Sequence, residues 1–422
     1  MAYRTISSLS LYLVLISGSP GAFAQAGYFR VEPREGVWWF IDPSGNPMLS
    51  IGADHVSYTA DEIQGTKDRP YAAALDKIYP DRNTWGLATL ARLRMWGFNT
   101  IGAWSDAALW NRDVPYTVIL DIDLRAGADW WKGRPGDVFD PKFESAAREV
   151  SEKNCAPRKN DPNLIGYFSD NELRWGPDWR GKETMLEMYL NLPEGSAGRE
   201  AAIEFLRHQY VNDMSKLNLA WGTNASSFEH LALPGTTDAY KQDSELFLER
   251  VAARYFSVCA EAIHAADPNH LYLGARFAGR VSDAVLKGAR AADVVSVNIY
   301  DFDPRPLVEH MFQVTHKPLM ITEFAFRAED SGLPNTRGAG PKVPNQQARA
   351  KAYADYVTRL ESLPEAVGFH WFEWVDEPKE GRFDGENSNY GLVNINDKPY
   401  QEFVDAVKQA NQAALEAHRK AH

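Results

Sequence analysis

Short apolar segments recur along the chain and alternate with stretches that have helical periodicity. Each segment is four or five residues long and almost wholly apolar, which is typical of strands covered on both faces of a parallel sheet. The eight segments are residues 49–52, 100–103, 117–120, 164–168, 271–275, 294–297, 319–322 and 367–371. Eight strands alternating with helices in one chain predict an α/β protein with a (β/α)8 TIM barrel.

The predicted helices lie between and after these segments, at residues 85–96, 143–152, 244–266, 281–291, 346–363 and 401–417. An open, doubly wound sheet with an appended domain is the alternative, but no GxGxxG sequence follows an early strand. About a hundred residues separate the fourth and fifth segments, far more than an ordinary connection. We therefore expect a helical excursion over the barrel mouth after the fourth strand. Residues 28–31 and 38–41 flank Pro33-Arg34-Glu35-Gly36, so a short N-terminal β-hairpin should precede the barrel.

The first residues have the pattern of a secretory signal peptide. Arg4 precedes an apolar run at residues 9–16, and Ala22-Phe23-Ala24 provides the small residues of a cleavage site. The sequence predicts a signal peptide over residues 1–24 and a single catalytic domain over residues 25–422, with an N-terminal core helix as the alternative. We accordingly expect a secreted or periplasmic protein without a membrane anchor, because the apolar run is too short to span a bilayer comfortably.

Charge and motif content argue against several other functions. The 45 Lys and Arg against 57 Asp and Glu leave a net charge of −12, which disfavours a nucleic-acid partner. Cys155 and Cys259 form no CxxC motif and the ten His form no HExxH motif, so we expect no metal and no other cofactor. No strand-like segment ends in Lys and no Gly-rich phosphate loop precedes the last helix, which disfavours a barrel aldolase or isomerase.

Two glutamates occupy the ends of the fourth and seventh predicted strands. Glu172 ends the stretch Ser169-Asp170-Asn171-Glu172, and Glu323 follows Ile321-Thr322. Catalytic residues of a (β/α)8 barrel lie at the carboxyl ends of its strands, where a carboxylate needs partners because burying an unpaired charge is costly. A structural ion pair would explain one such Glu, whereas two across the barrel mouth indicate a catalytic pair.

Further polar and aromatic residues follow the predicted strands and are candidate substrate ligands. They are Asp54, His55, Trp104, Asn171, Trp175, Arg276, Asn298, Tyr300, Trp371 and Glu373. Tyr300 and Arg276 could hold and orient a carboxylate, and Trp371 could form an apolar floor beneath a sugar ring. The structural alternatives are core packing for Trp371, an ion pair for Arg276 and a satisfied loop pair for Asp54 and His55. Other carboxylates near strand ends are sugar ligands or structural partners in this interpretation, namely Asp170, Asp376, Asp384 and Glu386.

The tryptophans are concentrated in the same positions. Seven of the 13 Trp follow predicted strands, namely Trp104, Trp130, Trp131, Trp175, Trp179, Trp371 and Trp374. Broad aromatic faces are frequent in binding pockets and can pack on the apolar C–H side of a sugar.

With these residues in place, the chain resembles the retaining glycoside hydrolases of clan A, most closely the β-agarase family and next the β-galactosidases of the Trp-Gly-Thr type. The matching stretches cover the chain from about Tyr28 to its end and are residues 163–176, 217–223, 323–324, 331–332, 368–378, 382–387 and 390–392. The resemblance implies a (β/α)8 fold with Glu172 as acid/base, Glu323 as nucleophile, Asn171 as a ligand of the sugar 2-hydroxyl and Tyr300 beside the nucleophile. Ala325 stands where agarases commonly have His, and Glu373 replaces a Gln-like residue.

The function predicted from this likeness is a secreted retaining β-glycosidase of β-linked, galactose-containing, agarose-like glycans. Its partner would be an oligo- or polysaccharide. For this role Glu323 should be ionised in the free enzyme and Glu172 should have a raised pKa. An exo-β-galactosidase or another hydrolase of short β-glycans is the enzymatic alternative. A catalytically silent carbohydrate-binding barrel is the alternative from another class, and the presence of both Glu disfavours it.

Overall fold

A computed structural model describes residues 27–110, 112–231, 233 and 235–421. The signal peptide expected over residues 1–24 lies outside the described residues. No helix in the described part of the chain is long and apolar enough to cross a membrane.

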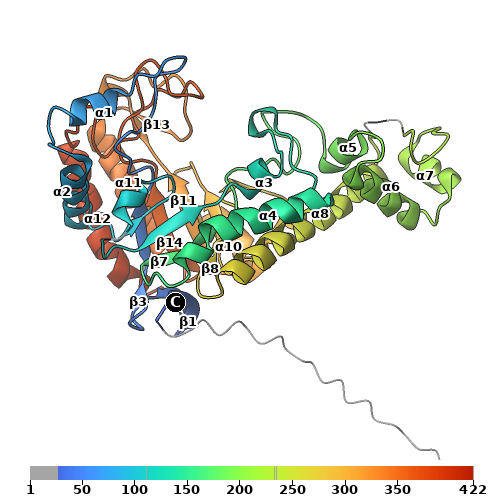
Figure 1. Cartoon of the computed structure of the whole chain (residues 1–422), viewed down its shortest axis with the longest axis horizontal. Helices are drawn as coiled ribbons and strands as arrows, with labels where there is room; N and C mark the ends of the chain where they lie inside the picture. The colour runs from blue at the N-terminus through green and yellow to red at the C-terminus, as the bar shows by residue number, and fades with distance from the viewer. Residues whose placement is uncertain (1–26, 111, 232, 234, 422) are drawn as a thin grey trace, which may run out of the picture.

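A curled parallel sheet of nine strands forms the centre of the molecule (Figure 1). In sheet order the strands are β8 (Leu271–Tyr272), β7 (Leu164–Phe168), β6 (Tyr116–Ile119), β5 (Thr100–Ile101), β4 (Ser50–Ala53), β14 (Ala366–Trp371), β11 (Leu319–Phe324), β10 (Val295–Asn298) and β9 (Phe277–Ala278). The two strands at the ends of this order, β8 and β9, are separated in the chain by residues 273–276 alone. The expected α/β, TIM-like class is therefore confirmed, and each of the eight predicted segments contains or overlaps a strand.

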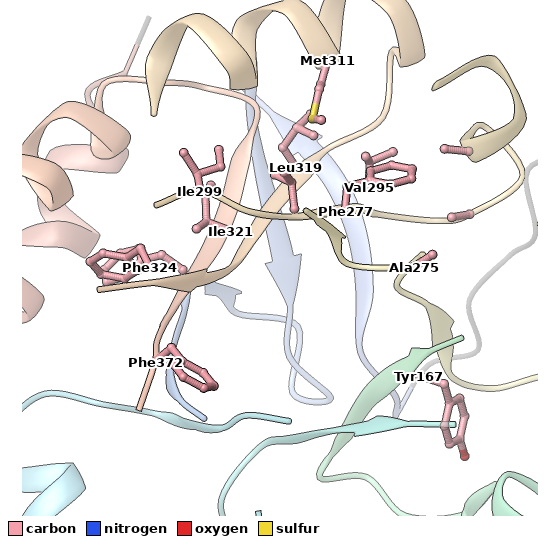
Figure 2. Close-up of a cluster of buried hydrophobic side chains, with 14 of the residues drawn as sticks. Tyr167, Ala275, Phe277, Val295, Ile299, Met311, Leu319, Ile321, Phe324 and Phe372 are labelled. Carbon is pink, nitrogen blue, oxygen red and sulfur yellow. The ribbon is translucent and has the colours of Figure 1, made fainter. Parts of the chain in front are cut away.

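The strand side chains alternate between two apolar clusters. Leu319 and Ile321 of β11 belong to a large cluster with Met311 and other helix residues, part of which Figure 2 displays. Met320, which lies between them, belongs to a second cluster with Ile165, Phe168, Leu273 and Val367. Because successive strand residues point to opposite faces, the first cluster faces the helices and the second fills the inside of the curled sheet.

A small antiparallel sheet contributes to the inner cluster. Its strands are β1 (Arg30–Arg34), β2 (Val37–Ile41) and β3 (Pro47–Met48). Phe40 of β2 and the preceding Phe29 pack among the inner side chains. The opposite, carboxyl-terminal end of the parallel strands carries the longer loops, which include the pair β12 (Arg327–Ala328) and β13 (Lys342–Val343).

Helices cover the outer face of the parallel sheet. The longer ones are α2 (Arg82–Met95), α4 (Pro141–Asn154), α8 (Asp238–Ala266), α10 (Arg305–Thr315), α11 (Gln346–Glu361) and α12 (Gln401–His418). The shorter ones are α1 (Pro70–Leu75), α3 (Ile122–Arg125), α9 (Asp283–Ala289) and the 3-10 turns η1 (Ala107–Leu109), η2 (Trp130–Lys132), η3 (Ala156–Arg158) and η4 (Glu329–Ser331). The sequence patterns indicated each of the longer helices except α10, whose first turn contains a proline.

The long segment between β7 and β8 contains α5 (Met185–Leu190), α6 (Ala197–Gln209), α7 (Met214–Trp221) and the 29-residue α8. In Figure 1, α5 to α7 lie to one side of the sheet, and α8 returns from them along α4. Thr237 caps α8 by accepting a hydrogen bond from the Tyr240 amide, which satisfies one of the free donors at the helix start. The helix thus leads the chain back to the sheet directly before β8.

Candidate active site

A cavity of about 440 Å³ lies at the carboxyl ends of the parallel strands. Its wall includes residues that directly follow four different strands or end them, such as His55, Trp104, Glu172 and Glu323. This is the end of the sheet at which barrel enzymes assemble their active sites.

Glu323 lies at the end of β11 and is held by two groups. The Tyr300 hydroxyl donates a hydrogen bond of 2.6 Å to its Oε2, and Arg276 Nη2 lies 3.1 Å from its Oε1. Glu323 is buried, with 4% of its surface exposed, and it still lines the cavity. The strand therefore presents one carboxyl group to the cavity with both oxygens oriented.

Glu172 reaches the same cavity from the loop after β7. Asn298 at the end of β10 donates from Nδ2 to Glu172 Oε1 over 2.9 Å and also lies 3.3 Å from Asn171 Oδ1. The residue has a φ of 52°, in the left-handed region that non-glycine residues seldom adopt. Two glutamates that are 151 positions apart in the sequence, at 172 and 323, thus line one cavity.

Arg276 links the ends of three strands. This fully buried side chain bonds Asp54 Oδ2 at 2.6 Å, Asn171 Oδ1 at 3.0 Å and the Thr322 carbonyl at 2.9 Å, in addition to Glu323. Its guanidinium lies 4.3 Å from the centre of the Trp104 ring. A planar guanidinium with several fixed donors suits such a hub, because each bond restricts the orientation of the others.

Burial dominates the ionisation of Glu323. Removal from water raises the pKa of Glu323 to about 8, although Arg276 and the Tyr300 hydrogen bond act in the opposite direction. The charges of Glu172 and Asp54 also contribute to this raised value. We expected an ionised Glu323, whereas a pKa of about 8 favours its protonated form at neutral pH, because the effect of burial outweighs that of Arg276.

His55 lies in the cavity wall between two buried carboxyl groups. Its Nδ1 contacts Glu373 Oε2 and lies 3.9 Å from Asp61 Oδ2. These negative charges raise the pKa of His55 to about 9 against the opposing effect of burial. Among the described residues, His55, Asp61 and Glu373 are also spaced closely enough to hold a metal, with their ligand atoms within 4.8 Å of one another. Direct contact between the His55 and Glu373 atoms favours a hydrogen-bonded arrangement over a metal site.

Aromatic side chains form much of the remaining wall. Trp104, Trp130, Trp131, Phe372 and Phe383 line the cavity. Trp131 of η2 meets Phe383, from the loop after β14, with their ring centres 5.8 Å apart and their planes nearly perpendicular. About half of the Trp131 surface and more of that of Phe383 are exposed, so apolar faces remain free beside the cavity.

Six of the predicted site residues line the cavity, and four others contact residues of this lining set. The lining residues are His55, Trp104, Asn171, Glu172, Tyr300 and Glu323. The supporting residues contact this first set but are buried and do not line the cavity: Asp54, Arg276, Asn298 and Glu373.

Trp371 and Trp175 lie outside the cavity wall, contrary to our expectation. Trp371 is fully buried in β14 and packs against Tyr353 of α11 and Phe403 of α12, because strand alternation turns it towards the helices. The next residue, Phe372, lines the cavity instead. Trp175 stacks on Phe256 of α8 and packs there as a core residue.

Sequence reasoning did not single out several lining residues. Asp121 and Asp123, which follow β6, are two of them, and Asp123 lies beside Asp170, which we expected to be a sugar ligand or a structural partner. Burial raises the pKa of Asp123 to about 7, and that of Asp170 is raised well above its usual range. The rule of examining strand ends would have found Asp121 and Asp123, whereas Asp61 lies in an irregular loop without any such signal.

We compared the chain with protein-family models and with curated proteins. No protein-family model matches it. Two curated proteins of Vibrio sp. (strain JT0107) are each 30% identical over 92% of this chain: β-agarase A, of which the match covers 45%, and β-agarase B, of which it covers 48%. The chain therefore spans less than half the length of these relatives.

Solved structures agree with the sequence relatives. The structure of an exo-β-agarase superimposes with a TM-score of 0.82 at 28% identity, over 94% of this chain and 66% of that one. The protein PfGH50B superimposes with a TM-score of 0.83 at 27% identity, over 95% and 68% of the two chains. A β-glucuronidase of Bifidobacterium dentium shares only the fold, at 14% identity and a TM-score of 0.51.

By fold and relatives, the chain is similar to the glycoside hydrolases of clan A. Within that class it is close to the β-agarases.

Proposed function

We propose that the chain hydrolyses β-linked, galactose-containing glycans of the agarose type with retention of anomeric configuration. The observation that carries this proposal is the pair Glu172 and Glu323, two carboxyl groups from different strand ends that line one cavity. The similarity to β-agarases supports the substrate class.

In the proposed mechanism, Glu323 attacks the anomeric carbon while Glu172 gives its proton to the departing glycosidic oxygen. The covalent glycosyl ester then reacts with water, whose proton returns to Glu172 as the bond to Glu323 breaks. Arg276 and Tyr300 hold the two oxygens of Glu323, and Asn298 orients Glu172. Since ionised Glu323 is the attacking form, it must lose its proton before this step.

Residues 25–422 are the catalytic domain in this proposal, and the protein acts outside the cytoplasm. The signal-peptide pattern of residues 1–24 supports export, which a secretion assay with and without these residues would test.

The deciding experiment is a hydrolysis screen over agarose, porphyran, galactans, β-glucans and aryl glycosides, with the anomer released first followed by NMR. We expect cleavage of agarose or its oligosaccharides with the β-anomer appearing first. Release of the α-anomer first would contradict retention, and cleavage of aryl or short β-galactosides alone would favour the exo-β-galactosidase. Binding without hydrolysis would favour the silent carbohydrate-binding barrel.

A further inference from the structure

His55, Asp61 and Glu373 meet at the cavity wall from three separate segments. His55 follows β4, Asp61 lies in the loop between β4 and α1, and Glu373 follows β14. Both carboxyl groups are buried, with 8% of Asp61 and none of Glu373 exposed. The imidazole ring is thus flanked by two buried acidic groups, one of which, Asp61, also lines the cavity.

This arrangement determines which nitrogen of His55 donates a hydrogen bond to the surrounding protein. Burial raises the pKa of Glu373 to about 7, although the His55 charge and hydrogen bond lower it. An ionised carboxylate is an acceptor only, so with Glu373 ionised Nδ1 donates in its contact with Oε2. The charged groups that face the ring are Asp61, Glu373 and Arg382, and the two negative ones outweigh Arg382 and raise the pKa of His55. Both ring nitrogens then carry protons near neutral pH.

Asp61 has no other evident structural task. Its Oδ2 is buried and accepts no hydrogen bond from the described residues; His55 Nδ1 lies 3.9 Å away, and the charge of Arg382 also acts on this carboxyl group. A buried carboxylate without hydrogen bonds is costly, so its placement beside the ring calls for a compensating positive charge.

The second ring nitrogen of His55 is free to meet a ligand. Nε2 makes no hydrogen bond with the described residues, and His55 lines the cavity together with Glu323 and Tyr300. An imidazolium donates from both nitrogens and accepts at neither, which suits it to a sugar hydroxyl or ether oxygen that acts as acceptor.

We propose that Asp61 and Glu373 clamp His55 as an imidazolium whose Nε2 donates a charge-assisted hydrogen bond to an oxygen of the bound sugar, which makes Asp61 a positioning residue. The assignment of the ligand as a sugar rests on the proposed function. The protonation of the ring does not depend on the proposed function and is measured without substrate.

The first test is an NMR titration of protein with isotopically labelled histidine, in which His55→Gln identifies the His55 signals. We expect His55 to be doubly protonated at pH 7, and we expect Asp61→Asn to lower its titration midpoint. The matched control is Asp68→Asn, the same substitution at an exposed position of the same loop, which should leave the midpoint unchanged. A neutral His55 at pH 7, or equal midpoints in Asp61→Asn and the parent protein, would overturn the proposal. So would loss of the His55 signals when Zn²⁺ is removed by a chelator, because a metal would then occupy the place of the proton.

The second test measures KM and kcat on agaro-oligosaccharides at pH 6 and at pH 8. Removing a charged hydrogen-bond donor in His55→Gln should lower kcat/KM about ten- to a hundredfold. Asp61→Asn should raise KM more at pH 8 than at pH 6, since the ring loses its charge earlier, and Asp68→Asn should match the parent protein at both. An Asp61→Asn effect that is equal at the two pH values would indicate a merely structural role. If the NMR titration behaves as expected but no glycan is cleaved, the proposed function fails and the protonation of His55 by Asp61 and Glu373 stands. If glycans are cleaved but the titration does not behave as expected, only the proposal for His55 is rejected.

Discussion

Burial raises the pKa of Glu323 while Arg276 and Tyr300 lower it, so the charge of this residue depends on pH. In the proposed mechanism the attacking form is ionised, while burial raises the pKa of this carboxyl group to about 8. In the free protein, the ionised fraction therefore grows as the pH rises through this value and is lost as the pH falls below it.

We predict that kcat/KM rises with pH on a limb displaced from the ordinary glutamate range towards pH 8. Tyr300→Phe should move this limb to higher pH, because it removes a hydrogen bond that lowers the pKa of Glu323. Tyr356→Phe removes a buried tyrosine hydroxyl that bonds the Ile299 carbonyl instead and should leave the limb unmoved. A limb near pH 4.5 in the parent protein would contradict the prediction.

Replacing the proposed nucleophile tests the site most directly. Glu323→Ala should leave less than about 1% of the hydrolytic activity, since no attacking group remains. The control is Glu361→Ala, which removes a buried carboxyl group of α11 outside the cavity wall and should retain activity. Circular dichroism and thermal unfolding would verify that both variants fold. Hydrolysis by Glu323→Ala above a few per cent of the parent rate would remove Glu323 from its assigned role.

At the scale of elements, close strand packing leaves no space for a side chain at Gly166. A Cβ added there would lie 2.2 Å from the Leu271 carbonyl oxygen of the adjacent strand β8. We predict that Gly166→Ala lowers the free energy of unfolding by about 1–3 kcal/mol, because the backbones of β7 and β8 must separate. At Gly176 no heavy atom lies within 4 Å of the added Cβ, so Gly176→Ala should change stability little. Urea unfolding of the two variants would measure the difference, and equal stability would contradict this account of the packing.

Strand-end positions were predictable because strand order in a barrel follows from the alternation of apolar and helical segments. That pattern alone brought Glu172, Glu323 and Tyr300 to one cavity. It did not determine which way a side chain points at the last residue of a strand, so Trp371 was assigned to the cavity that Phe372 lines. The same pattern cannot predict contacts made by irregular loops, such as the one between Asp61 and His55.

At the scale of the whole molecule, two loops distant in sequence meet beside the cavity through Trp131 and Phe383. We predict that Phe383→Ala raises KM for agarose by up to about tenfold, because an exposed aromatic face that can pack on a chain of sugars is lost. An aryl glycoside that occupies only the catalytic cavity should be cleaved at nearly the parent rate. Phe302→Ala provides the matched control, since Phe302 is also partly exposed but does not line the cavity. An equal loss on both substrates would show that Phe383 supports the catalytic groups instead.

The pairing of β4 with β14 also governs when the site can form during synthesis. This parallel pair joins residues 50–53 to residues 368–371, and His55 and Glu373 follow its two strands. A growing chain consequently reaches the proposed nucleophile well before the sheet can close, because closure requires the last strand. Nascent chains that end before β14 contain both Glu172 and Glu323 yet lack the neighbour that completes the wall. The cavity wall is therefore completed late, when β14 docks against β4.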